Sequence, residues 1–128
     1  MEYAIVPYCN CCKGNAYRTA YDFAAPAALA IGTTCHDGNI PAENRLISFD
    51  NPFLHVTACK QAEDRDTTIL RFFNLTDEKQ TLNASVCESV KEAWSTNLNE
   101  ERDEALCIVN GSLSIDIPAK KIITIELV

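Results

Sequence analysis

Two neighbouring stretches decide the fold of this chain, Phe53-Leu-His-Val-Thr-Ala-Cys59 and Thr67-Thr-Ile-Leu-Arg-Phe-Phe73. Both are short runs rich in β-branched and aromatic residues, and the charged stretch Gln61–Asp66 separates them. Apolar runs bounded by polar turn residues predict strands. Residues 53–60 and 67–75 are therefore predicted to form a hairpin.

Further strand-like runs follow at short intervals along the chain. They are Leu46–Phe49, Gln80–Val86, Ser112–Ile117 and Lys121–Val128. Asn110-Gly111 follows Cys107–Val109, and because both residues of such a pair tolerate a positive φ angle, it predicts a second hairpin. Closely spaced strands with polar turns are typical of an antiparallel sandwich. The predicted fold is all-β, an antiparallel β-sandwich with one short N-terminal helix.

The helix is predicted in the more irregular first part of the chain. Glu2–Tyr8 has the composition of a strand, which Pro7 closes. Asn15–Ala25 places its apolar residues at helical spacing, and Pro26 ends the helix. No linker tract divides the chain, so residues 1–128 are predicted to form a single domain. Its irregular part covers residues 1–45, and the sandwich strands cover residues 46–128.

One segment of the sandwich part has two interpretations. Val86, Val90, Trp94 and Leu98 recur at every fourth residue, which is the spacing of a helical stripe. An extended strand would also place Val86, Val90 and Trp94 on one face. The pattern alone slightly favours a helix.

Composition and charge exclude several classes of protein. A hydrophobic content of 47% is enough to bury a core, and the net charge of −7 disfavours binding to nucleic acid or anionic lipid. No apolar run approaches the roughly 18 residues of a membrane span. The stretch Met1–Pro7 lacks the features of a signal peptide, and the seven cysteines are an odd number. We therefore expect reduced thiols and a cytoplasmic location.

The cysteine-rich loop is the candidate metal site. Cys9 and Cys12 have the C-x₂-C spacing of zinc ligands, Cys11 lies between them, and Cys35 and His36 follow downstream. Zinc requires four ligands in a tetrahedron, and the adjacent Cys35 and His36 cannot easily both reach one ion. We interpret the loop as a group of reduced thiols and expect no metal in this chain.

The candidate catalytic groups are two histidines and the acidic turns. A cysteine nucleophile would need a base, and only His36 and His55 are present. His55 alternates with Leu54 and Val56, as a solvent-facing or hydrogen-bonded strand histidine would. The acids lie in predicted turns: Glu63, Asp64, Asp66, Asp77, Glu78, Glu100, Glu101, Asp103 and Glu104. We interpret them as solvated side chains rather than the facing pair that glycoside hydrolysis requires, so no catalytic residue is predicted.

The aromatic residues offer a hypothesis of sugar binding. Trp94 together with Tyr3, Tyr8, Tyr17 and Tyr21 could stack on the apolar faces of sugar rings. Sandwich cores also use aromatic residues, and Trp94 is more typical of a core position.

Arg71 is a charged residue inside the apolar run Ile69-Leu-Arg-Phe-Phe73. It either faces solvent through strand alternation or pairs with a carboxylate across the sheet.

The stretch Lys60-Gln-Ala-Glu-Asp-Arg-Asp-Thr-Thr-Ile-Leu-Arg-Phe-Phe-Asn-Leu-Thr76 resembles the C-terminal β domain of family 38 glycoside hydrolases, the α-mannosidases. Other pieces resemble that family in the same order along the chain. They are Glu2-Tyr-Ala-Ile-Val-Pro7, Tyr17-Arg-Thr-Ala-Tyr-Asp-Phe23, Trp94-Ser-Thr-Asn-Leu-Asn-Glu100 and Ile115-Asp-Ile-Pro-Ala-Lys-Lys-Ile-Ile-Thr-Ile-Glu-Leu127. The resemblance covers nearly the whole chain.

The resemblance implies strand rather than helix for residues 86–98. It also implies that the chain is a C-terminal accessory domain, excised from a larger enzyme and inactive by itself. Members of the family are retaining mannosidases that use a zinc-like divalent metal and an aspartate nucleophile in an upstream domain. The implied partners are the N-terminal and central domains of the same enzyme and the carbohydrate substrate of the parent. The loop around Cys9, Cys11 and Cys12 departs from the family.

Two alternatives remain open from the sequence. One is a stand-alone carbohydrate-binding module that uses Trp94 or the tyrosines. The other is a small thiol or metal-binding β protein built on Cys9, Cys12 and Cys35. As a fragment, the chain is expected to expose an apolar face, which would allow a homo-oligomer to form.

Overall fold

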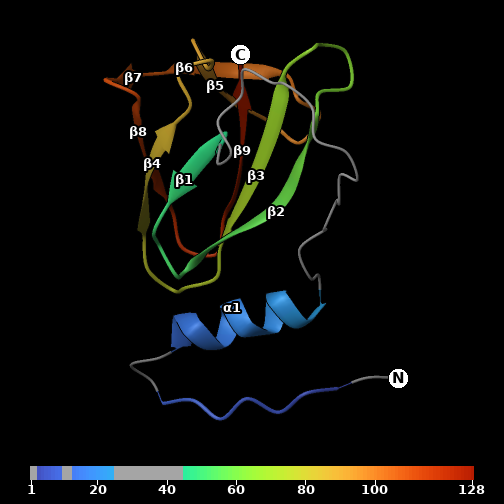
Figure 1. Cartoon of the computed structure of the whole chain (residues 1–128), viewed down its shortest axis with the longest axis vertical. Helices are drawn as coiled ribbons and strands as arrows, with labels where there is room; N and C mark the ends of the chain where they lie inside the picture. The colour runs from blue at the N-terminus through green and yellow to red at the C-terminus, as the bar shows by residue number, and fades with distance from the viewer. Residues whose placement is uncertain (1–2, 10–12, 25–44) are drawn as a thin grey trace, which may run out of the picture. The chain divides into compact units, whose positions relative to one another are not determined.

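A computed structural model describes residues 3–9, 13–24 and 45–128 of the chain (Figure 1). The chain divides into two compact units, residues 1–44 and residues 45–128. Each unit has its own secondary structure.

The N-terminal unit contains one helix, α1 (Lys13–Ala24), among its described residues. The predicted helix is confirmed, although it begins two residues earlier than expected. Alanine at positions 16, 20 and 24 favours it, because alanine has the highest helix propensity. The strand predicted over Glu2–Tyr8 is wrong for the described residues 3–8, which lie outside regular secondary structure. β-forming residues alone do not make a strand without a partner to complete the ladder.

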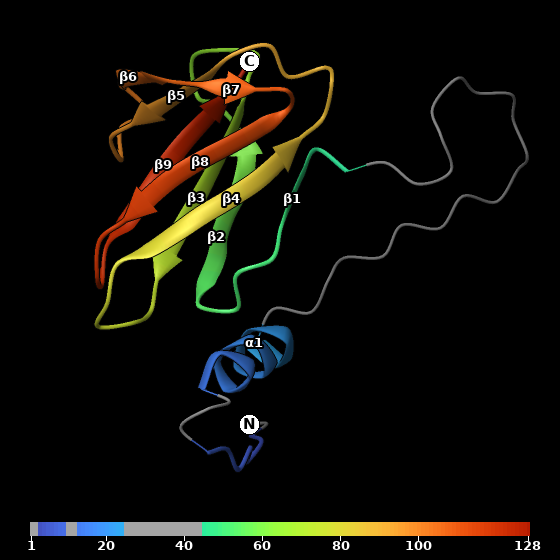
Figure 2. The same cartoon turned by 90° about the vertical axis from the view of Figure 1, so that its left-hand side faces the viewer.

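The second unit consists of nine strands in two antiparallel sheets, as the predicted sandwich requires. The four-stranded sheet has the order β1-β4-β8-β7, and the five-stranded sheet has the order β2-β3-β9-β5-β6. The bounds are β1 Ile47–Phe49, β2 Leu54–Gln61, β3 Thr68–Asn74, β4 Gln80–Val86, β5 Ala93–Thr96, β6 Arg102–Leu106, β7 Ile108–Val109, β8 Ser112–Ile117 and β9 Ile122–Leu127. Figure 2 shows β4 and β8 lying across β2 and β3.

Both predicted hairpins are confirmed. β2 pairs with β3, with a bulge between Val56 and Ala58, and β7 pairs with β8. The second hairpin turns at Asn110 and Gly111, whose φ angles are 51° and 73°. Two successive positive φ angles are what a type I′ two-residue hairpin turn requires.

The ambiguous segment after β4 is neither a helix nor one long strand. Val86 ends β4, and only Ala93–Thr96 form a strand, β5. Between them, the backbone amides of Lys91 and Glu92 donate to the carbonyl oxygen of Val128, at 2.7 and 3.3 Å. Pairing with the end of the chain therefore overrides the helical spacing.

A second local prediction also fails. The stretch Glu100–Glu104 was expected to be a solvated loop, but Arg102–Leu106 form the edge strand β6. β6 carries exposed charges, which is a common property of edge strands.

The core lies between the two sheets. Phe72, Leu82 and Ile117 are fully buried in it, and the ring of Phe49 meets that of Phe72 edge to face, with their centroids 5.2 Å apart. Burying each side chain of this size stabilises the fold by about 2 to 3 kcal/mol.

Among the described residues, no helix is long and apolar enough to cross a lipid bilayer.

Candidate functional site

A buried carboxylate on the outer face of the five-stranded sheet is the most unusual chemical feature of the sandwich. Glu126 in β9 has an exposed fraction of 0%. In the register of β3 and β9 it lies opposite Ile69, whereas Leu70 and Ile125 lie opposite each other in the core. Because successive strand residues face opposite sides, Glu126 points away from the core.

Three side chains from distant parts of the chain hold this carboxylate. Arg102 donates from Nε to Oε2 at 2.7 Å and from Nη2 to Oε1 at 3.0 Å. Arg65 Nε and Thr67 Oγ1 donate to Oε1, at 2.8 and 2.6 Å. We call Glu126, Arg65, Thr67 and Arg102 the Glu126 cluster. A two-point arginine contact of this kind is among the strongest polar interactions in proteins.

The cluster lowers the pKa of Glu126 to about 2. The hydrogen bond from Arg102 is the main cause, and the bonds from Thr67 and Arg65 add to it. Burial acts in the opposite direction, since it disfavours the charged form. Glu126 is therefore ionised at any pH near neutrality.

Trp94 lies beside the cluster. It is opposite Glu126 in the register of β5 and β9, and the guanidinium carbon of Arg102 lies 5.1 Å from its ring centroid. Its indole Nε1 donates to Glu92 at 3.3 Å. Since Arg102 stacks on the ring, one face of Trp94 is occupied by a cation–π contact rather than available to a sugar.

A second buried carboxylate joins two turns of the same sheet. Glu100, in the turn before β6, is 6% exposed and has a φ angle of 66°. Its carboxylate accepts from Lys60 Nζ at 2.7 Å and from the backbone amide of Glu63 at 2.8 Å, and its carbonyl oxygen accepts from Arg65. The contact with Lys60 is the main reason that the pKa of Glu100 is lowered. The turn between β2 and β3 is thus fastened to the turn between β5 and β6.

Asn74 ties the turns at the other end of β3. It has an exposed fraction of 0%, and its side-chain amide donates to the carbonyl oxygens of Glu78, Ile117 and Pro118 at 2.8, 3.1 and 2.9 Å. Its Oδ1 accepts from the backbone and hydroxyl of Thr76. One buried amide therefore connects the β3–β4 and β8–β9 turns.

Arg71 lies on the outer face of the sheet, as strand alternation predicts, because its neighbours Leu70 and Phe72 face the core. It is half-buried, and its Nε donates to the hydroxyl of Thr124, its opposite residue in β9, at 3.1 Å. Its partner across the sheet is therefore a hydroxyl group rather than a carboxylate.

The acidic residues are mostly solvated, as predicted. Glu63, Asp64, Asp66, Asp77, Glu78, Glu101, Asp103 and Glu104 are exposed. Glu100 contradicts the prediction because it is buried. Its left-handed backbone turns the side chain back toward Lys60, and no local charge pattern could show this.

The candidate cysteine and histidine ligands are only partly described. Cys11, Cys12, Cys35 and His36 lie outside the described residues, and Cys9 is exposed. The described residues include no group of three or more His, Cys, Asp or Glu side chains that could hold a metal ion.

His55 does not face solvent. It is 8% exposed and lies opposite Phe73 in β3, so of its two interpretations only the solvent-facing one is wrong.

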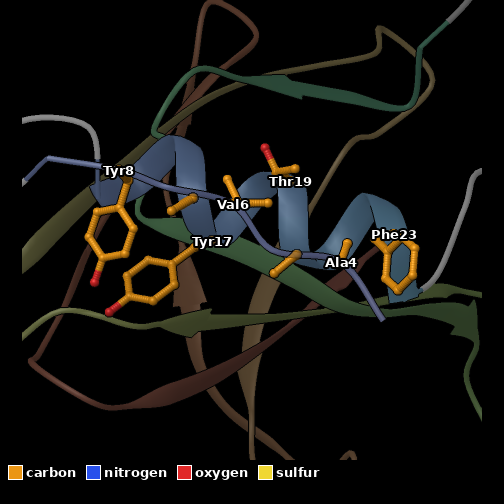
Figure 3. Close-up of a pocket in the computed structure, with 8 residues that line it drawn as sticks. Ala4, Val6, Tyr8, Tyr17, Thr19 and Phe23 are labelled. Atoms are coloured by element: carbon orange, nitrogen blue, oxygen red, sulfur yellow. The ribbon is translucent and has the colours of Figure 1, made fainter. Parts of the chain in front are cut away.

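The predicted tyrosines belong to the N-terminal unit, whereas Trp94 belongs to the sandwich. Tyr3 and Tyr8 are 84% and 56% exposed. Figure 3 shows Tyr8 and Tyr17 together at one end of a hollow and Phe23 at its other end. The hollow, of about 430 Å³, is lined by Ala4, Val6, Tyr8, Ala16, Tyr17, Thr19, Ala20 and Phe23. The lining holds no charged group, so this surface is better suited to packing than to the dense hydrogen bonding of a sugar.

Sequence reasoning did not single out Glu126 as a site residue. The available signal was an acid between Ile125 and Leu127 in an otherwise apolar terminal strand. An acid in such a position is buried only when it is paired.

Two antiparallel sheets packed on a shared apolar core, with buried polar contacts that hold their turns, define a β-sandwich domain. The family model for the "Glycosyl hydrolases family 38 C-terminal beta sandwich domain" matches residues 54–125, which is more than half of the chain. The chain therefore belongs to this family, and the resemblance found in the sequence is confirmed. As the C-terminal sandwich of family 38, it is an accessory domain of a glycosidase that has other domains. No curated protein matches the chain.

Proposed function

We propose that this chain is the C-terminal accessory domain of an α-mannosidase-like retaining glycoside hydrolase, which removes terminal α-mannosyl residues in its intact form. The family match over residues 54–125 carries the proposal. The matched range runs from the start of β2 into β9 and contains Arg65, Thr67, Glu100 and Arg102; Glu126 lies one residue beyond it.

The role proposed for the domain is to pack on the other domains of the enzyme and shape its substrate cleft. The contacts of Glu126, Glu100 and Asn74 support this role because all three hold turns in fixed positions. Turns fixed by buried polar contacts provide a rigid surface against which another domain can pack.

The chemistry of the buried carboxylates argues for a structural role. A general acid must titrate near the working pH and must reach the substrate. Glu126 has a pKa of about 2, an exposed fraction of 0% and contacts to two arginines. Proton transfer to a glycosidic oxygen by this group is therefore unfavourable.

The aspartate nucleophile and the divalent metal of such an enzyme are assigned to its other domains. The described residues offer no set of three ligands for a metal ion. The partners proposed for this chain are the other domains of the same polypeptide and, through them, the mannoside substrate.

The test uses the natural gene product that contains this sequence. We expect it to hydrolyse an aryl α-D-mannoside, to leave the matching aryl β-D-mannoside intact, and to be much longer than 128 residues when detected with an antibody to the sandwich. The isolated chain is the matched control and is expected to hydrolyse neither.

Two outcomes would overturn the proposal. A natural product of only this length that releases heat with mannose in calorimetry would identify a carbohydrate-binding module instead. About one zinc ion per purified chain would identify a metal protein, since a structural zinc site binds its ion tightly.

We further propose a cytoplasmic location for the protein. Cys59 and Cys107 support it, because both are exposed free thiols in the sandwich and such thiols persist in a reducing compartment. Fractionation of the source cells tests this, and recovery of the chain only from a secreted fraction would contradict it.

A further inference from the structure

The turn between β7 and β8 contains the only Asn-Gly pair in the sequence. Asn110 and Gly111 are both exposed, and both have positive φ angles. The ladder pairs Val109 with Ser112, so the two turn residues lie outside it.

The side-chain amide of Asn110 makes no hydrogen bond to any described residue. Three other asparagines of the sandwich have side chains held by hydrogen bonds. Asn74 is buried with three carbonyl partners, Asn83 accepts from Ser114 at 2.8 Å, and Asn97 donates to Glu101 at 2.6 Å. Each of these three is followed by a residue with a side chain, whereas Asn110 is followed by glycine.

We propose that Asn110 is a site of spontaneous deamidation and isomerisation in this domain. The backbone nitrogen of Gly111 attacks the side-chain carbon Cγ of Asn110. A nitrogen–carbon bond forms, the bond from Cγ to Nδ2 breaks, and Nδ2 leaves as ammonia with the proton that the Gly111 nitrogen loses. Water then opens the cyclic imide at either carbonyl, which yields aspartate or isoaspartate at position 110.

Glycine favours the attack because it has no Cβ to obstruct its nitrogen. The turn itself slows the reaction, since the left-handed conformation of Asn110 must relax before the nitrogen can reach Cγ. Hairpin tips open locally at low free-energy cost, so the reaction proceeds from the folded domain through such openings.

The isoaspartate product changes the local structure. It adds one backbone carbon to a two-residue turn that sets the register of Ile108 and Val109 against β8. It also displaces the carbonyl oxygen of Gly111, which accepts from the amide of Val86 at 2.9 Å. Because β7 pairs only with β8, the expected consequence is a time-dependent release of this edge strand.

The test is to incubate the folded full chain in mildly alkaline buffer and to map its peptides by mass spectrometry, with an isoaspartate-specific methylation assay. We expect conversion at Asn110 to be roughly tenfold faster than at Asn83 or Asn97, because only Asn110 precedes a residue without Cβ. Hydrogen exchange at the amides of Ile108 and Val109 is expected to be faster in the aged protein.

Gly111→Asp is the matched control. A Cβ at position 111 has Val86 O as its nearest contact, at 3.7 Å, and aspartate tolerates a positive φ angle. The variant is expected to keep the fold by circular dichroism and to lose the fast conversion. Asn110→Asp, which retains the glycine, is the second control and is expected to release no ammonia from this position. The proposal is overturned by equal conversion of Asn110, Asn83 and Asn97, or by unchanged conversion of Asn110 in Gly111→Asp.

Discussion

Along β9, alternate residues face opposite sides of the five-stranded sheet, and the two sides are buried in different ways. Ile125 faces inward and packs among apolar side chains from both sheets. Glu126, its neighbour, faces outward and is equally buried, but by two arginines and a threonine. On the inner side of the sheet, side chains are buried by close apolar packing. On the outer side, the carboxylate is buried by pairing with opposite charge.

The contacts that join distant turns of the domain lie on the outer face. Apolar packing of the inner kind would suit any sandwich. The outer face instead joins the turn that contains Arg65 to the turn that contains Glu100, and so it fixes the surface that the domain presents.

The largest effect is expected from the inner face. Phe72→Ala removes a ring that has an exposed fraction of 0%, and it should lower the free energy of unfolding by about 4 kcal/mol because a cavity remains. Urea denaturation of the full chain measures this. Ile122→Ala, at a position that is 50% exposed, is the control, and it should lower the free energy of unfolding much less. Equal losses for the two variants would contradict the assignment of the core.

A smaller effect is expected from the outer face. Glu126→Gln keeps the shape of the side chain but removes the carboxylate that Arg65 and Arg102 share. We expect the free energy of unfolding to fall by about 2 kcal/mol. This is less than for a fully buried ion pair, because both arginine side chains are 34% exposed to water. The same denaturation experiment measures it, and an unchanged or higher stability would show that the cluster does not stabilise the fold.

The outer face should also give the domain a characteristic response to acid. The pKa of Glu126 is about 2 when folded and 4.5 in the reference state. Its contribution is therefore fully present above pH 4.5 and is lost as the pH falls toward 2. We expect the difference in unfolding free energy between the native chain and Glu126→Gln to shrink over this interval. A constant difference would contradict the lowered pKa.

The smallest effect is expected from an exposed ion pair on the four-stranded sheet. Lys79 Nζ lies 2.7 Å from Asp116, but the two side chains are 63% and 54% exposed. Since water screens such pairs, Asp116→Asn should leave the unfolding midpoint within experimental error. A loss of stability as large as that of Glu126→Gln would contradict the expectation that buried ion pairs stabilise this domain more than exposed ones.

The N-terminal unit contrasts with the sandwich in what could be predicted from its sequence. The helix α1 was found from its spacing, whereas the strand expected at Glu2–Tyr8 has no ladder partner among the described residues. In the sandwich, Gln80–Val86 and Ser112–Ile117 were predicted with the bounds that the structure has. The prediction succeeded where alternation and turn residues coincided, and it failed for residues 86–98, where pairing with Val128 determines the conformation.

The sequence by itself determined both hairpins, most of the other strands and the family, because these follow from the order of residues along the chain. The tertiary structure alone decided which charges are buried. Arg65 and Glu126 are 61 positions apart, and Lys60 and Glu100 are 40 positions apart, so no local pattern relates them. A carboxylate is buried only where folding brings a cation into contact with it. That contact depends on the topology of the whole sheet.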